Sequence, residues 1–195
     1  MKQRILAMLI FTGICMAGCQ KENVAPDSTP TKANPKSSPS TNLNQDTISN
    51  DTTRGYLRLQ LAKDAVNADN ILLEFSPAAK CSYSGSEDAR TFQGMGQVSL
   101  SSLSSDNVAL AINSLPLSTK GTVVGLVVNA KSTGAYKLNL SAIHTIPASI
   151  DIWLKDKYKK DSLDFRQYPS YAFNITADTN TFGSHRFSVV MRAHH

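Results

Sequence analysis

The sequence predicts an all-β protein, whose folded part is a single antiparallel β-sandwich. Apolar residues recur at every second position in several stretches after residue 54, which is typical of strands with one buried face. Turn-forming residues separate these stretches at intervals of about 8–12 residues. No stretch in this part keeps an apolar period of about 3.6 residues over the length of a substantial helix. We therefore expect about 8–10 strands in an Ig-like or jelly-roll-like arrangement.

Five segments show the alternation most clearly. In the first, Leu57, Leu59 and Leu61 alternate with polar residues, so the leucines are expected in the core and their neighbours in solvent. In the segment with Phe187, Val189 and Met191, the same pattern places Arg186 on the solvent-exposed face. His185 is in phase with Phe187 and is expected in a hydrogen-bonded, partly buried position. The apolar positions of the other four segments are Tyr136, Leu138 and Leu140; Ile150, Ile152 and Leu154; Tyr171, Phe173 and Ile175; and Phe187, Val189 and Met191.

Four further strands are expected from short apolar runs between turns. One of these runs, Val123–Val128, is apolar at odd and even positions apart from Gly125, which favours a central strand covered on both faces. About 140 residues follow residue 54, enough for one hydrophobic core. The four expected strands are Asn70–Phe75, Gln97–Leu100, Asn107–Asn113 and Thr122–Asn129.

The N-terminus carries the features of a secretory signal. Lys2 and Arg4 precede the apolar run Ile5–Ile14, which is too short to cross a bilayer of about 30 Å as a helix. The sequence Met16-Ala17-Gly18-Cys19 resembles the bacterial lipobox. This resemblance implies that residues 1–18 form a lipoprotein signal peptide and that Cys19 is acylated. The alternative is an ordinary signal peptide with a cysteine nearby by chance.

An acylated Cys19 implies a membrane as partner, with each buried CH₂ contributing about 0.8 kcal/mol and two or more chains giving a stable anchor. Gln20 follows in place of aspartate, so an inner-membrane retention signal is absent. Gln20-Lys21-Glu22 resembles the short charged export signals of surface lipoproteins in Bacteroidota. The expected location is the outer membrane at the cell surface, with a periplasm-facing position as the alternative.

Residues 19–53 are expected to form a disordered tether. Four prolines lie here among Ser, Thr, Asn, Asp and Lys, with too few apolar residues to offset chain entropy. Its end-to-end distance should be on the order of 30–35 Å. Asp46-Thr47-Ile48, Asp51-Thr52-Thr53 and Asp161-Ser162-Leu163 resemble the O-glycosylation sequon of Bacteroidota. That resemblance makes Thr47 and Thr52 candidate glycosylation sites.

Charge and cysteine usage give little indication of catalysis or of nucleic-acid binding. Removing Lys2 and Arg4 with the signal lowers the formal net charge from +5 to +3. The remaining basic residues are scattered except between Lys155 and Lys160, where Asp156 and Asp161 are interleaved, and this pattern indicates a solvated hairpin tip. Cys81 has no partner in the body for a disulfide. It is either a small buried hydrophobe or an exposed reactive thiol.

No constellation of catalytic residues is recognisable. The adjacent acids Glu87 and Asp88 could be an acid pair, but glycosidase carboxylates must face each other across a substrate, and a solvated loop is the plainer interpretation. No nucleophile elbow, phosphate loop or dinucleotide fingerprint occurs. The histidines lack ligand spacing, so no metal site or cofactor is expected. We expect a protein that is not an enzyme.

The candidate ligand-binding residues are Trp153, Tyr158, Tyr168 and Lys155. Trp153 falls on the face of its strand opposite to Ile152 and Leu154. An indole on a wet face could stack on a sugar or anchor a protein partner. The alternative is that a loop covers this face and Trp153 simply packs there.

A family resemblance covers nearly all of the body, from about Leu57 to Met191. The segments that carry it are Asn107–Pro116, Thr122–Asn129, Gly134–Leu140, Ile150–Lys157, Leu163–Arg166, Tyr171–Phe173 and Arg186–Val189. Their order resembles the β-sandwich module near the C-terminus of large secreted and cell-surface proteins of Bacteroidota, often preceding a type IX secretion sorting domain. We expect no sorting domain after His195, and we expect a lipid at Cys19 to supply the attachment instead. The resemblance implies a surface-display or adhesion module with no activity.

The expected domains are therefore the signal peptide (1–18), the lipidated cysteine and tether (19–53) and the β-sandwich (54–195). The expected function is a membrane-anchored, non-catalytic adhesion, interaction or envelope-structural protein. The alternative is a carbohydrate-binding module at the cell surface. An unidentified protein or glycan would be the partner.

Overall fold

The computed structural model describes residues 54–92, 94, 96–118 and 120–194. All of them belong to one compact unit, Ile48–His195. The expected signal peptide and tether lie outside the described residues, as do Cys19, Thr47 and Thr52. No helix in the described part of the chain has the length and apolar character needed to cross a membrane.

The described body is all-β, as the sequence predicts. It contains eleven strands and one short 3-10 helix, with no α-helix between residues 54 and 194 outside the three undescribed positions. The elements are β1 (Gly55–Ala62), β2 (Ala68–Phe75), β3 (Ala89–Arg90), β4 (Val98–Leu103), β5 (Ala109–Leu115), β6 (Thr122–Ala130), β7 (Gly134–His144), β8 (Ile150–Asp156), β9 (Asp161–Asp164), β10 (Ser170–Ile175), η1 (Thr179–Thr181) and β11 (Gly183–Ala193).

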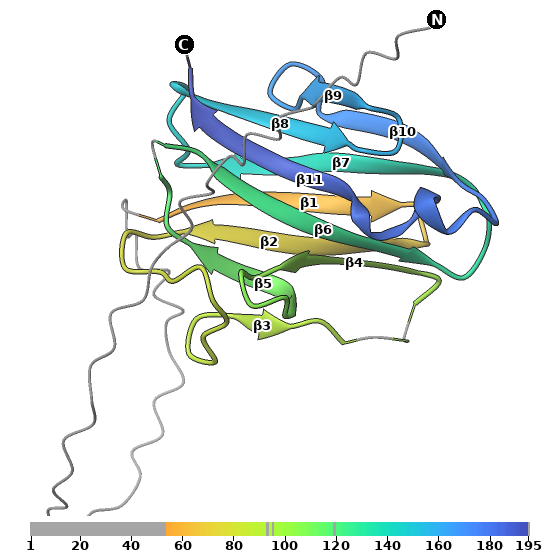
Figure 1. Ribbon diagram of the computed structural model, residues 1–195, viewed down its shortest axis with the longest axis horizontal. Helices are drawn as coiled ribbons and strands as arrows, with labels where there is room; N and C mark the ends of the chain where they lie inside the picture. Colours follow the sequence, from red (N-terminus) through yellow and green to blue (C-terminus); the bar gives the residue numbers. More distant parts are fainter. Residues whose placement is uncertain (1–53, 93, 95, 119, 195) are drawn as a thin grey trace, which may run out of the picture. The chain divides into compact units, whose positions relative to one another are not determined.

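The strands form one mixed sheet that is nearly closed into a barrel (Figure 1). The hydrogen-bonded order is β10-β7-β1-β2-β5-β4-β6-β11-β8-β9, and the short strand β3 pairs with β5 off this path. All pairs are antiparallel except β2 and β5, which run parallel. The expected class is thus confirmed, but a single antiparallel sandwich is not. The chain between β2 and β5 makes a long crossover through β3 and β4, which allows a parallel pair.

The core lies on the inward face of this sheet, and the five alternating segments supply most of it. Their fifteen apolar positions are all buried, which confirms the expected phase of each segment. β6 lies between β4 and β11, so its central position is also confirmed. The prediction that both faces of β6 are covered is wrong. Val123 points outward and is 70% exposed, while Val124 is 1% exposed.

Two charged residues that the sequence analysis places in solvent, Arg186 and Asp156, lie in the interior. The register of β11 against β6 shifts between Gly183 and Phe187, so Arg186 and Phe187 are both buried and His185 is exposed. The four-residue step from Gly183 to Phe187 in β11 faces a two-residue step from Val128 to Leu126 in β6, and this irregular pairing breaks the strict alternation of buried and exposed residues. Asp156 shares the core-facing phase of Ile152 and Leu154 and is 1% exposed, so it is not part of a solvated tip.

The two edges of the sheet are connected by the segment 165–169, between β9 and β10. At one end, the Phe165 N–H donates to the Ile152 carbonyl of β8 at 2.8 Å. At the other end, the Pro169 carbonyl accepts from the Leu140 N–H of β7 at 2.8 Å. We call the junction between β10 on one side and β8, β9 and β11 on the other the seam.

A second irregularity lies between β2 and β4. β5 pairs with β2 only from Leu72 to Phe75, and with β4 only at Ser102 and Leu103. Near the start of β4, the Leu100 N–H instead donates to the Asp69 carboxylate at 2.8 Å. Leu100 is almost fully buried, so this side chain replaces a backbone partner that the neighbouring strand does not supply.

Replacing Asp69 with alanine should therefore destabilise the fold. Asp69→Ala leaves the buried Leu100 N–H without its acceptor, which costs about 1–3 kcal/mol of unfolding free energy. Asp64→Ala is the matched control, because Asp64 also accepts backbone N–H groups, but in an exposed turn. Chemical denaturation should show a clearly smaller loss for Asp64→Ala. Equal losses would contradict the role assigned to Asp69.

Candidate functional site

Trp153 and Lys155 lie on the outer face of β8, as expected. Trp153 is half-buried, and the Arg192 guanidinium carbon of β11 lies 6.0 Å from the centre of its ring. In the sheet register Trp153 is paired with Val190 and Asp164. Lys155 is exposed. The indole is thus partly covered by a neighbouring side chain of the same sheet.

Tyr158 and Tyr168 are exposed, at 47% and 60%. Tyr158 lies in the turn between β8 and β9, with its ring centre 5.2 Å from the Arg186 guanidinium carbon. Tyr168 lies in the 165–169 segment, where its N–H donates to the Asp164 carbonyl. Among the ring contacts of the described residues, none joins two of Trp153, Tyr158 and Tyr168. The structure does not combine them into one stacking platform.

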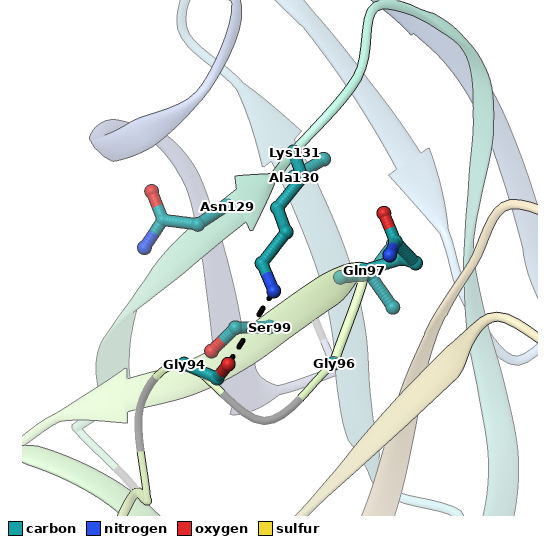
Figure 2. A pocket seen from close by; sticks show the side chains of 8 residues that line it. Gly94, Gly96, Gln97, Ser99, Asn129, Ala130 and Lys131 are labelled. Carbon is teal, nitrogen blue, oxygen red and sulfur yellow. Dashed lines mark hydrogen bonds between the residues drawn. The ribbon is translucent and has the colours of Figure 1, made fainter.

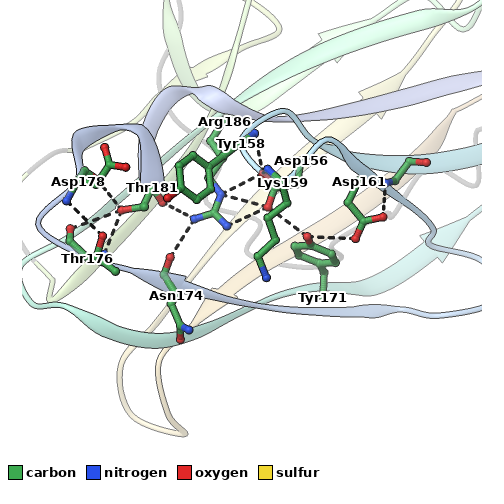
Figure 3. Close-up of polar contacts among 11 residues, drawn as sticks. Asp156, Tyr158, Lys159, Asp161, Tyr171, Asn174, Thr176, Asp178, Thr181 and Arg186 are labelled. Atoms are coloured by element: carbon green, nitrogen blue, oxygen red, sulfur yellow. Dashed lines mark hydrogen bonds and ion pairs between the residues drawn. The ribbon is translucent and has the colours of Figure 1, made fainter.

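The most elaborate polar cluster is a buried one around Arg186 and Asp156 (Figure 3). Their side chains form an ion pair, with Nη2 and Oδ2 separated by 2.9 Å and each side chain 1% exposed. Arg186 Nε donates to the same carboxylate at 3.2 Å. Arg186 Nη1 donates to the carbonyls of Asn174 at 2.9 Å and Thr181 at 2.6 Å. The guanidinium therefore has partners on three of its sides, as a buried cation requires.

Asp156 is equally well supplied with donors. Its Oδ1 accepts from the backbone N–H groups of Tyr158 and Lys159, at 3.0 and 3.2 Å. Its Oδ2 accepts from the Tyr171 hydroxyl at 3.1 Å. The same hydroxyl also lies 3.4 Å from Asp161 Oδ2. Figure 3 shows Arg186 and Tyr171 approaching this carboxylate from two sides.

These contacts determine the protonation states of the cluster. Burial by itself would raise the pKa of Asp156, but the hydrogen bonds and charge of Arg186, with the Lys159 N–H, outweigh it and lower that pKa. Burial, followed by the charge of Asp156, raises the pKa of Tyr171. The cluster at neutral pH is thus an ionised pair with a neutral phenol. Arg186, Asp156 and Tyr171 each have hydrogen-bond partners within the fold. The cluster therefore stabilises the structure.

Of the two adjacent candidate acids, Asp88 also holds backbone in place with its carboxylate. Asp88 accepts from the N–H groups of Ser84 and Ser114, each at 2.7 Å, and the Glu87 carbonyl accepts from the Ser114 hydroxyl at 3.0 Å. Glu87 and Asp88 are half-buried, whereas Gly85 and Ser86 before them are exposed, so the loop is partly solvated. Asp88 attaches the loop before β3 to β5. Cys81, in the same loop, is also half-buried.

At the C-terminal end of β11, His194 and Asp151 form an exposed pair, with Nδ1 and Oδ1 2.8 Å apart. The hydrogen bond with His194 lowers the pKa of Asp151. The described residues contain no group of three or more His, Cys, Asp or Glu side chains that could hold a metal ion.

An open hollow of about 190 Å³ lies where β4 begins and β6 ends (Figure 2). Its lining combines glycine backbone and polar side chains with the apolar residues Val98 and Ala130, and Lys131 Nζ reaches across to the Gly94 carbonyl at 3.4 Å. None of Trp153, Lys155, Tyr158 or Tyr168 contributes to it. The hollow is shallow and offers one cation and a few amide groups.

Comparisons of the chain with protein-family models, with curated proteins and with solved structures found no match. The site is therefore interpreted from its own geometry.

The buried pair was missed in the sequence, although half of it left a signal. Asp156 continues the period of Ile150, Ile152 and Leu154, so its position on the core face was visible in the pattern. Arg186 left no such signal, because the register shift of β11 against β6 beside it is a feature of strand pairing and not of the local sequence.

Breaking the ion pair should be strongly destabilising. Asp156→Leu leaves the Arg186 cation buried without its counter-charge, and should cost about 3–5 kcal/mol of unfolding free energy. Asp151→Ala, which removes the acid of an exposed pair, is the control and should change stability little. The double variant Asp156→Leu/Arg186→Met should recover most of the loss in urea denaturation. A double variant as unstable as Asp156→Leu would contradict this account.

The same pair should make stability depend on pH in the acid range. The pKa of Asp156 is lowered from its ordinary value of 3.8 in the folded state, so the unfolded chain binds the proton more tightly. The stabilisation is therefore complete well above pH 3.8 and is lost as pH falls through the folded pKa. Unfolding free energies measured from pH 6 downward should fall more steeply for the native chain than for Asp156→Leu/Arg186→Met. Parallel curves would show that Asp156 does not contribute.

Proposed function

We propose that this protein is a lipid-anchored, non-catalytic interaction protein of the bacterial outer membrane, displayed at the cell surface. The observation that carries the proposal is the Met16-Ala17-Gly18-Cys19 sequence after a short apolar run. Acylation of Cys19 would attach the β-rich body to the membrane through residues 20–53. The resemblance to the β-sandwich surface module of Bacteroidota agrees with this proposal, although the parallel β2–β5 pair is a departure from an antiparallel sandwich.

The polar chemistry of the body supports a binding role over catalysis. Asp156, Arg186 and Tyr171 are engaged with one another in the interior, and Asp88 is engaged with backbone N–H groups. Carboxylates used in this way hold loops and strands together. The exposed tyrosines and lysines are among the groups open to contact with a partner.

Carbohydrate binding is the second candidate, and exposed aromatic rings favour it. Tyr158 and Tyr168 present about half or more of their surface to solvent, and aromatic rings are the usual platform for sugar stacking because they combine an apolar face with a polar tip. Thr47 and Thr52 would place O-glycans on the tether, keeping the body away from the membrane.

The anchor can be tested by labelling cells that express the full chain with radioactive or alkyne palmitate. The native chain should incorporate label and fractionate with the outer membrane, because several acyl chains bind a bilayer stably. Cys19→Ala should lose both properties. Cys15→Ala is the matched control, since it removes a neighbouring cysteine upstream of the expected cleavage site and should retain label.

Protease treatment of intact cells then tests the location. A surface-displayed body is digested on intact cells, and a periplasm-facing one only after the outer membrane is permeabilised.

Incorporation of palmitate by Cys19→Ala, or soluble native chain in the periplasm, would refute the anchor.

A further inference from the structure

The β8–β9 hairpin carries an exposed group of positive charges. Its turn, residues 157–160, contains Lys157, Lys159 and Lys160, and Lys155 precedes it on β8. All four lysines are exposed. We call these four residues with Tyr158 the basic tip.

The acids that alternate with these lysines in the sequence do not cancel their charge in the structure. Asp156 is turned into the core, where Arg186 neutralises it. Asp161 is exposed and receives the Ser162 N–H at 2.8 Å. The ion pairs found among the described residues are Arg186–Asp156 and His194–Asp151, and neither involves a tip lysine. Four cations thus face solvent, with Asp161 next to them in the chain and Asp178 beside Tyr158.

The backbone of the basic tip is held from below by the buried pair. Asp156 Oδ1 accepts from the N–H groups of Tyr158 and Lys159, and the Lys157 N–H donates to the Arg186 carbonyl at 2.8 Å. Lys160 closes the turn with a φ of 55°. A turn fixed in this way loses little conformational entropy when it binds, so its charges act together.

An aromatic ring lies within this charged group. Tyr158 is 47% exposed, and its ring rests near the Arg186 guanidinium at 5.2 Å from the ring centre. The orientation of the ring is thus supported from the protein side, and the remainder of its surface is open. Asp178, which caps η1, lies close enough for the Tyr158 hydroxyl to help lower its pKa, after the larger effect of the Asn180 N–H.

We propose that the basic tip binds anionic polysaccharide, a linear glycan with carboxylate or sulfate groups. Repeated negative charges on such a chain match lysines spread around a convex turn, and a sugar ring can stack on Tyr158. Lysine ammonium groups are mobile point charges and suit this kind of extended polyanion better than one fixed phosphate. The choice of a glycan over a nucleic acid or a lipid rests on the proposed display at the cell surface.

The test is binding of the purified full chain, in detergent, to immobilised dextran sulfate and polygalacturonate, with neutral dextran as the reference. The native chain should bind both anionic polymers and not dextran, and binding should weaken as salt is raised. Lys157→Gln/Lys159→Gln/Lys160→Gln should lose about tenfold or more in affinity, because three exposed charge contacts are removed together.

The matched control is Lys80→Gln/Lys120→Gln/Lys137→Gln. It removes the same charge from three lysines that are exposed elsewhere on the body, and should bind nearly as tightly as the native chain. Tyr158→Leu should weaken polysaccharide binding severalfold, whereas Phe92→Leu, which changes an exposed aromatic residue outside the tip, should not. Thermal unfolding of each variant shows whether the fold is retained; a loss of affinity in a variant with the native midpoint supports the proposal.

Several results would overturn the proposal. Equal losses for the two triple-lysine variants would show that affinity follows net charge alone. Binding to dextran would show that the site does not recognise charge. Tighter binding to phosphatidylglycerol vesicles or to duplex DNA than to either anionic polymer would assign the tip to another polyanion. None of these results depends on acylation of Cys19, so a failure here is distinguishable from a failure of the proposed anchor.

Discussion

The buried ion pair between Arg186 and Asp156 is the interaction on which the closure of this sheet depends. β9 and β10 are the last strands of the hydrogen-bonded order, so no backbone ladder joins them across the seam. Side chains make the connection instead: Arg186 of β11 reaches the Asn174 carbonyl of β10, and Tyr171 of β10 reaches Asp156 of β8. Phe173 and Phe187 pack across the same junction, 4.8 Å apart.

The same carboxylate links the interior to the surface. Because Asp156 is directed inward to Arg186, it also receives the N–H groups that shape the turn after β8. The lysines of that turn are then left without the acid that precedes them in the sequence. An arrangement that closes the sheet therefore also holds a positively charged turn in one conformation. In this region the inward orientation of the Asp156 side chain therefore determines both the packing of the core and the charge of the surface.

The fold class and most of the core could be predicted, because they depend on local periodicity. Leu57, Leu59 and Leu61 alternate with polar residues and are buried as that pattern requires. The parallel β2–β5 pair could not be predicted, since strand order depends on the path of the crossover. The alternation predicts Arg186 on the outer face, and this is wrong because the pairing of β11 with β6 is irregular between Gly183 and Phe187. For the candidate site, Trp153 and Lys155 lie on the expected outer face, but the order of strands and turns keeps the three aromatic rings apart.

A polar seam has a consequence that an apolar one would not have. Apolar contacts across the seam are not directional, whereas the hydrogen bonds from Arg186 to the Asn174 and Thr181 carbonyls require a defined geometry. Burying a charged pair gains little stability compared with apolar packing of the same volume. Its effect here is to select one alignment of β10 against β11 where no backbone ladder does so. This alignment orients Tyr171 toward Asp156 and thereby completes the support under the β8–β9 turn.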